Sequence, residues 1–197
     1  MKRRDFLKGS AIVPAAVATA RWPVMAKMIG ARRLRIAAVV YDERYADCWM
    51  FAETLAQQGT IALPTGGDAA RLWYGALREQ LALRGGNVAG MTTDADLLVS
   101  CGCGREMNMR MAYEGFHDCR TSGRMKHDLR GKGEEREVYA ALLRADAPWA
   151  EALAEALMRV PASDRAGTQG PSMEQATATT SRGAGNPGYL TSWLLSI

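Results

Sequence analysis

The sequence predicts an α/β fold: a single three-layer domain in which a mostly parallel sheet of about five strands is flanked by helices. Two observations predict it. Short apolar runs rich in β-branched residues alternate along the chain with segments whose apolar residues recur at helical spacing. The composition is also that of a globular protein, since 48% of the 197 residues are hydrophobic and 23% are charged. With 7 Pro and 4 Cys, a disordered chain, a collagen-like repeat and a disulfide-dense miniprotein are excluded.

The first half of the predicted domain consists of strand and helix units. Apolar runs predict strands over 34–41, 60–64 and 87–91. The first helix is expected to begin at Asp47 as N-cap and to end at Gly59. A second helix follows Asp68, and its apolar face is closed by the glycines at 85–86.

A third helix is predicted from the spacing of Thr93 and Asp96, which is close to a capping box, toward Glu106. Gly102 and Gly104 oppose it by about 1 kcal/mol each relative to Ala. Alternating methionines and polar residues over 107–113 then predict a strand. A methionine stripe on a helix is the alternative.

The second half of the chain is less regular. Basic and acidic residues alternate over 120–136, which we interpret as a loop. Helical patterns follow over 134–144 and 146–160. The Ser-, Thr- and Gly-rich stretch 161–188 predicts a flexible loop, and the apolar end over 189–197 predicts a last strand. The expected domain is therefore 34–197.

The N-terminus carries paired arginines in the pattern Arg3-Arg4-x-Phe6-Leu7-Lys8, followed by an apolar, Ala-rich stretch over 11–20. This arrangement resembles a twin-arginine translocation (Tat) signal peptide, with cleavage after Ala20 or, alternatively, after Ala26. The resemblance implies cargo that folds in the cytoplasm, engages the Tat machinery and reaches the periplasm. An apolar run of about ten residues is too short to span a bilayer, which takes about twenty, so no stable membrane anchor is expected after cleavage.

Most of the positive charge belongs to this signal. The formal net charge is +4, and the first 20 residues contribute +3 of it, because Lys2, Arg3, Arg4 and Lys8 outweigh Asp5. The remaining 177 residues carry +1. A nearly neutral domain whose basic segment, 120–136, has no aromatic residues between its charges does not predict nucleic-acid binding.

The part after the signal resembles small, uncharacterised Tat-exported bacterial proteins. The residues that carry this resemblance are Asp68-x-x-x-x-Trp73-Tyr74, Val88-Ala89-Gly90-x-Thr92 and a terminal Ser192-Trp193-x-x segment. The resemblance implies no activity.

Polar residues follow the predicted strands, at the edge where α/β sheets bind ligands. Besides Glu43 and Thr65, the candidates for ligand binding or acid–base chemistry are Asp42, Arg44, Asp68, Thr92, Thr93 and His117. The alternative is structural, with Asp68 and Thr93 as helix caps and Asp42 and Arg44 as solvated turn residues. No glycine-rich nucleotide fingerprint, phosphate loop or nucleophile elbow occurs, so the cofactor is unknown.

The cysteines allow a further alternative. Cys101 and Cys103 could form a redox pair or, with His117 and Cys119, bind Zn²⁺ or Cu⁺. If they lie on a helix, their side chains point about 200° apart and cannot share a metal. A structural role, with Cys48 and Cys101 as small buried residues, is the other possibility.

From these observations we expect an exported periplasmic protein that binds a small molecule or a protein partner, on its own or beside an exported oxidoreductase. One alternative is a small periplasmic enzyme that uses Asp42, Asp68 and His117. The other is thiol-redox or metal chemistry at Cys101 and Cys103.

Overall fold

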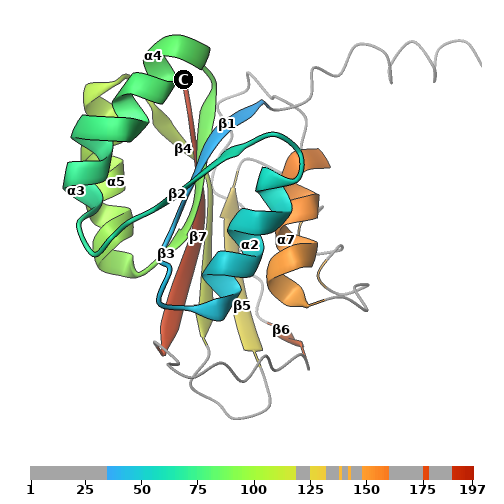
Figure 1. Ribbon diagram of the computed structural model, residues 1–197. Coiled ribbons are helices and arrows are strands. Elements are labelled where there is room, and N and C mark those ends of the chain that lie inside the picture. The colour runs from blue at the N-terminus through green and yellow to red at the C-terminus, as the bar shows by residue number, and fades with distance from the viewer. Residues whose placement is uncertain are drawn as a thin grey trace, which may run out of the picture. The chain divides into compact units, whose positions relative to one another are not determined.

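The computed structural model describes residues 35–118, 125–131, 138, 142, 148–159, 175–177 and 188–197. They belong to one compact unit, Arg33–Ile197 (Figure 1). A central sheet separates two layers of helices, so the prediction of an α/β domain is confirmed.

The sheet has seven strands in the order β2-β1-β3-β7-β4-β5-β6. Strands β1 (Ile36–Tyr41), β2 (Ile61–Pro64) and β3 (Asn87–Thr92) are paired in parallel. The other strands join through antiparallel pairs: β4 (Arg110–Asp118), β5 (Met125–Gly131), β6 (Gln175–Thr177) and β7 (Tyr189–Ser196). The sheet is therefore mixed and larger than the mostly parallel sheet of about five strands that we expected. The reason is β7, which enters between β3 and β4 and runs opposite to both.

Helices cover both faces of the sheet (Figure 1). One face carries α3 (Ala69–Leu72), a π-helical turn (Trp73–Leu77), α4 (Arg78–Arg84) and α5 (Asp94–Glu106), and the other carries α2 (Ala46–Ala56) and α7 (Trp149–Arg159). Each face has its own hydrophobic core. Trp73, Leu77 and Trp193 lie in the first core, and Phe51, Leu153 and Leu194 lie in the second.

Side-chain capping accounts for two helix starts. Thr93 accepts the backbone N–H of Asp96 at 3.5 Å and begins α5, and Asp68 accepts the N–H of Arg71 at 2.9 Å and begins α3. The expected cap at Asp47 is wrong, because α2 already begins at Ala46 with Tyr45 in the cap position. The turn after β1 causes this early start: the N–H of Tyr45 donates to the carbonyl of Asp42 at 3.2 Å, which directs the chain into the helix.

Two segments of the second half differ from expectation. The predicted loop 120–136 contains β5, where Met125, His127 and Leu129 are buried and alternate with more exposed residues. The predicted flexible loop 161–188 contains β6, while the rest of it, apart from 188, lies outside the described residues. The same holds for the predicted helix 134–144, of which Val138 and Leu142 are described, both helical and buried.

A close contact joins β3 to β7 on the face of α5. Gly90 pairs with Trp193, and a Cβ added at Gly90 would overlap the Trp193 ring. The indole N–H of Trp193 donates to the hydroxyl of Thr92 at 3.1 Å. Two of the sequence patterns noted above, around Gly90 and around Trp193, are therefore halves of one packing unit.

Candidate functional site

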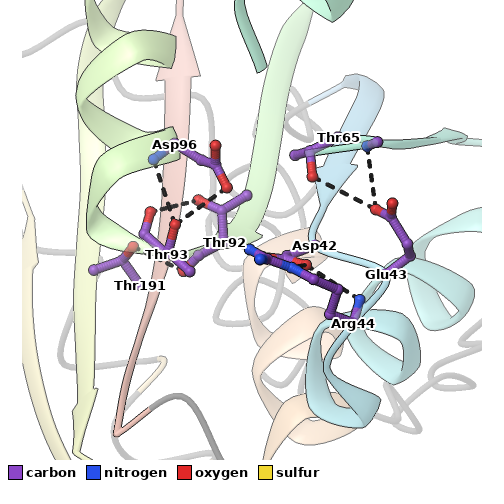
Figure 2. A network of polar contacts seen from close by, with 9 residues as sticks. Asp42, Glu43, Arg44, Thr65, Thr92, Thr93, Asp96 and Thr191 are labelled. Atoms are coloured by element: carbon purple, nitrogen blue, oxygen red, sulfur yellow. Dashed lines mark hydrogen bonds and ion pairs between the residues drawn. The ribbon is translucent and has the colours of Figure 1, made fainter. Parts of the chain in front are cut away.

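Most of the polar residues predicted at the carboxyl ends of the parallel strands lie close together there (Figure 2). Two backbone hydrogen bonds hold the loops after β1 and β2 in place, one from the N–H of Asp42 to Met91 and one from the N–H of Thr65 to Tyr41, at 3.2 and 2.9 Å. Because these bonds extend the pairing of the strands, the loops are fixed by the sheet rather than by their own sequence.

Asp42 and Arg44 form the central ion pair. The Arg44 guanidinium donates through Nε and Nη2 to the two carboxylate oxygens of Asp42, at 2.8 and 2.6 Å. The backbone N–H of Arg44 donates to Asp42 at 3.1 Å as well. The side chain of Asp42 is completely buried, whereas 58% of the Arg44 side chain is exposed. A buried carboxylate thus fixes the plane of an exposed guanidinium.

Glu43 connects the loop after β1 to the loop after β2. Its carboxylate accepts from the hydroxyl of Thr65 at 3.5 Å and from the backbone N–H of Gly66 at 3.3 Å (Figure 2). Glu43 itself is exposed. These bonds fix the separation between the two loops.

The end of β3 supplies the third part of the edge. The Thr92 hydroxyl donates to the carbonyl of Thr93 at 3.1 Å, and the Thr191 hydroxyl donates to the Thr92 carbonyl at 3.1 Å. Thr93 donates to the carboxylate of Asp96 at 3.1 Å. Burial raises the pKa of Asp96, and the Thr93 hydrogen bond opposes that rise. Asp42, Glu43 and Arg44 also act on this pKa, so Asp96 lies within their electrostatic reach.

Two of the predicted site residues lie apart from this edge. Asp68 is exposed, and its carboxylate caps α3. His117 lies at the carboxyl end of β4, as expected, but it is completely buried beneath α7, where its ring packs 4.6 Å from that of Trp149. Thr92 contacts Trp193 on the face of α5, so the His117 side chain and the edge network belong to opposite faces of the sheet.

His117 is part of a buried polar cluster that the sequence did not reveal. Its Nε2 lies 2.8 Å from the hydroxyl of Ser192, and that hydroxyl lies 3.2 Å from the Tyr113 hydroxyl. Its Nδ1 lies 2.6 Å from Nδ1 of His127. One of these two nitrogens must donate to the other, because two protons or two lone pairs cannot face each other at this distance. Gly115 leaves the necessary space, since a Cβ there would lie 2.5 Å from the Tyr113 oxygen.

Burial keeps this cluster uncharged. It lowers the pKa of His127 to about 4 and lowers that of His117 well below its ordinary value, with further lowering from His127. Burial also raises the pKa of Tyr113, although Ser192 opposes the rise. The indole N–H of Trp149 has no hydrogen-bond partner in the structure as described. Uncharged and charged residues alternate over 125–130, and this pattern could have predicted a strand with the His127 side chain on its buried face.

Cys101 and Cys103 both lie on α5, so their side chains point in different directions, as helical geometry requires. Neither thiol forms a disulfide, and burial raises the pKa of each. A raised pKa disfavours the thiolate, which is the reactive form. Cys119 lies outside the described residues. Within the parts of the chain that the structure describes, no three His, Cys, Asp or Glu side chains are arranged to hold a metal ion.

Comparison with known proteins identifies the N-terminus. Residues 1–20 match the family described as the TAT (twin-arginine translocation) pathway signal sequence. No curated protein and no solved structure matches the chain, and the resemblance of the later part to small Tat-exported proteins stays a prediction. No helix among the described residues is both long and apolar enough to cross a membrane. The chain therefore begins with a Tat signal sequence, which marks it for export and for contact with the Tat machinery.

Proposed function

We propose that the chain is a periplasmic ligand-binding protein that is exported in folded form and holds a small polar molecule at the carboxyl edge of β1, β2 and β3. The observation that carries the proposal is the Asp42–Arg44 pair. A flexible arginine loses much side-chain entropy when it binds a ligand, but Arg44 is already fixed by two hydrogen bonds to a buried carboxylate. The N–H groups of Arg44 that do not bond to Asp42 are therefore preorganised to bind a carboxylate or a similar acceptor.

The neighbouring charges narrow the ligand class. Glu43 is exposed and lies between Asp42 and Arg44 in the chain, and the charges of Glu43 and Arg44 both act on the pKa of Asp96. These acids repel a polyanion and attract an ammonium group. The edge therefore suits a small zwitterion, with its carboxylate at Arg44 and its amino group toward Glu43 and Asp96.

A catalytic role has less support. Both oxygens of Asp42 accept from Arg44, the Thr92 hydroxyl is bonded to backbone and to Trp193, and Thr93 caps α5. These groups are engaged in holding the edge together. An enzyme that uses Asp42, Asp68 and His117 would need these three side chains close together. They lie on different elements, and the His117 side chain lies on the other face of the sheet.

Thermal unfolding of the full chain with a panel of free amino acids and simple monocarboxylates tests this proposal. A ligand at ten times its Kd adds about 1.4 kcal/mol of stability, which raises the Tm of a domain of this size by about 3–6 °C. Arg44→Lys keeps a charge beside Asp42 but loses the planar fork, so the Tm increment should disappear. Arg71→Lys, on α3, is the matched control and should keep it.

Two results would contradict the proposal: no probe of either kind raises Tm, or Arg44→Lys responds as the unaltered chain does. An accessory role would instead be supported by copurification with one defined exported partner in stoichiometric amount, combined with failure of every small-molecule probe.

A further inference from the structure

A pocket of about 390 Å³ opens on the flank of the sheet, where α2 passes beside the edge strand β2. Its volume falls in the range of small-molecule sites, which is about 300–1,000 Å³. One wall is a face of α2, and the other wall is formed by Tyr41 at the end of β1 and Ala62 on β2. The pocket is separate from the Asp42–Arg44 network, because none of the residues in that network lines it.

Helical spacing creates the hollow. Trp49, Ala52, Glu53 and Ala56 stand at positions i, i+3, i+4 and i+7 of α2, so they share one face. The two alanines on this face, with Ala62 opposite, leave the volume that larger side chains would fill. Trp49 lies on the same face of α2 as the two alanines, and 53% of its surface is exposed, which is unusual for the largest apolar side chain.

The charge of the pocket lining is negative. Among the described residues that line the pocket, Glu53 is the charged one, and Trp49 and Tyr41 supply two aromatic rings. Aromatic faces attract cations, and a nearby carboxylate adds to that attraction. Apart from these groups, the lining offers the Gln57 amide and the methyl groups of alanines.

We propose that this pocket binds a small methylated ammonium compound, with the cationic head against Trp49 and Tyr41 and its charge balanced by Glu53. A quaternary ammonium head donates no N–H hydrogen bonds, so the sparse polar lining satisfies it, and its methyl groups pack against Ala52, Ala56 and Ala62. A sugar would stack on Trp49 equally well, but its many hydroxyls need more partners than Glu53 and Gln57 provide. This proposal is independent of the carboxyl-edge site, since it uses none of the side chains proposed to bind a ligand there.

The test compares choline with 3,3-dimethyl-1-butanol, which has the same shape but no charge. Each is titrated into the full chain, and binding is measured by calorimetry. We expect choline to bind at least tenfold more tightly than the neutral isostere. Trp49→Ala and Glu53→Gln should each weaken choline binding at least fivefold, because Trp49 and Glu53 are exposed and their replacement leaves the fold intact.

Matched controls lie elsewhere on the surface. Tyr74→Ala removes an exposed aromatic ring from the opposite face of the sheet, and Glu79→Gln removes an acid from α4. Neither should change choline binding. Ala56→Leu provides a steric test that leaves every charge in place, and it should abolish binding while circular dichroism shows an unchanged fold.

Three outcomes would overturn the proposal: equal binding of choline and its neutral isostere, no binding of choline, or binding of methyl glucoside in its place. Failure here is distinguishable from failure of the carboxyl-edge site. Arg44→Lys should leave choline binding unchanged, and Trp49→Ala should leave the response to amino acids unchanged.

Discussion

Replacement of Gly90 by alanine should be among the most damaging single-methyl changes in this domain. A Cβ at this position would overlap the six-membered ring of Trp193 and lie 2.7 Å from its Nε1. Trp193 is completely buried between β3 and the helices on its face, so its ring has little room to move aside. The ring must tilt or the two strands must separate.

The magnitude follows from two contributions. Overpacking a tight core costs about 1–3 kcal/mol. Displacement of the indole also breaks its bond to the buried Thr92 hydroxyl, and leaving buried polar groups unpaired costs about 1–3 kcal/mol. The expected loss is therefore about 2–6 kcal/mol, a large part of the 5–15 kcal/mol by which a typical domain is stable.

Urea unfolding followed by tryptophan fluorescence measures this loss. Gly102→Ala is the matched control, because it makes the same change within α5 where nothing lies within 4 Å of the added methyl. It should stabilise the domain by about 0.5–1 kcal/mol. In a Trp193→Phe background the cost of Gly90→Ala should shrink, since the smaller ring leaves room. A loss below 1 kcal/mol for Gly90→Ala in the unaltered background would refute the reasoning.

Two further predictions concern acid and export. The pKa of His127 falls to about 4 on folding. Below pH 6.5 the unfolded chain therefore binds a proton that the folded chain does not bind, so the folded state loses stability as the pH falls toward 4. Between pH 7 and pH 5 this residue alone should lower the free energy of unfolding by about 2 kcal/mol. Urea titrations at the two pH values check this, and His127→Gln should show a smaller pH dependence; equal slopes would contradict it. Replacing Arg3 and Arg4 by Lys should leave the chain in the cytoplasm, as judged by cell fractionation, whereas unaltered export would argue against the Tat route.

Local rules predicted much of the parallel part of the fold. Thr93 and Asp68 were identifiable as caps because a cap depends on residues two or three positions away. The carboxyl-edge network followed from the strand assignments, since parallel strands end at a common edge. One alternative for this network treated Asp42 as a solvated turn residue. Its carboxylate is instead fully buried, because the backbone N–H of Asp42 continues the hydrogen bonding of β1 with β3.

Long-range pairing was not predictable in the same way. The position of β7 between β3 and β4 depends on contacts across about 100 residues, such as Thr92 with Thr191. The strand β5 was missed because charges at alternate positions were interpreted as a loop, although His127 between Met125 and Leu129 had the period of a strand. The pairing of His127 with His117 follows only from that register.

The place of β7 in the sheet also sets when the protein can fold. This strand is synthesised after the other six, yet it joins the parallel half of the sheet to the antiparallel half. Before the residues of β7 leave the ribosome, both hydrophobic cores lack the side chains that this strand contributes, and β3 and β4 each present an unpaired edge. A transport route that accepts folded cargo would then be offered this protein only after the strand between Tyr189 and Ser196 has been made.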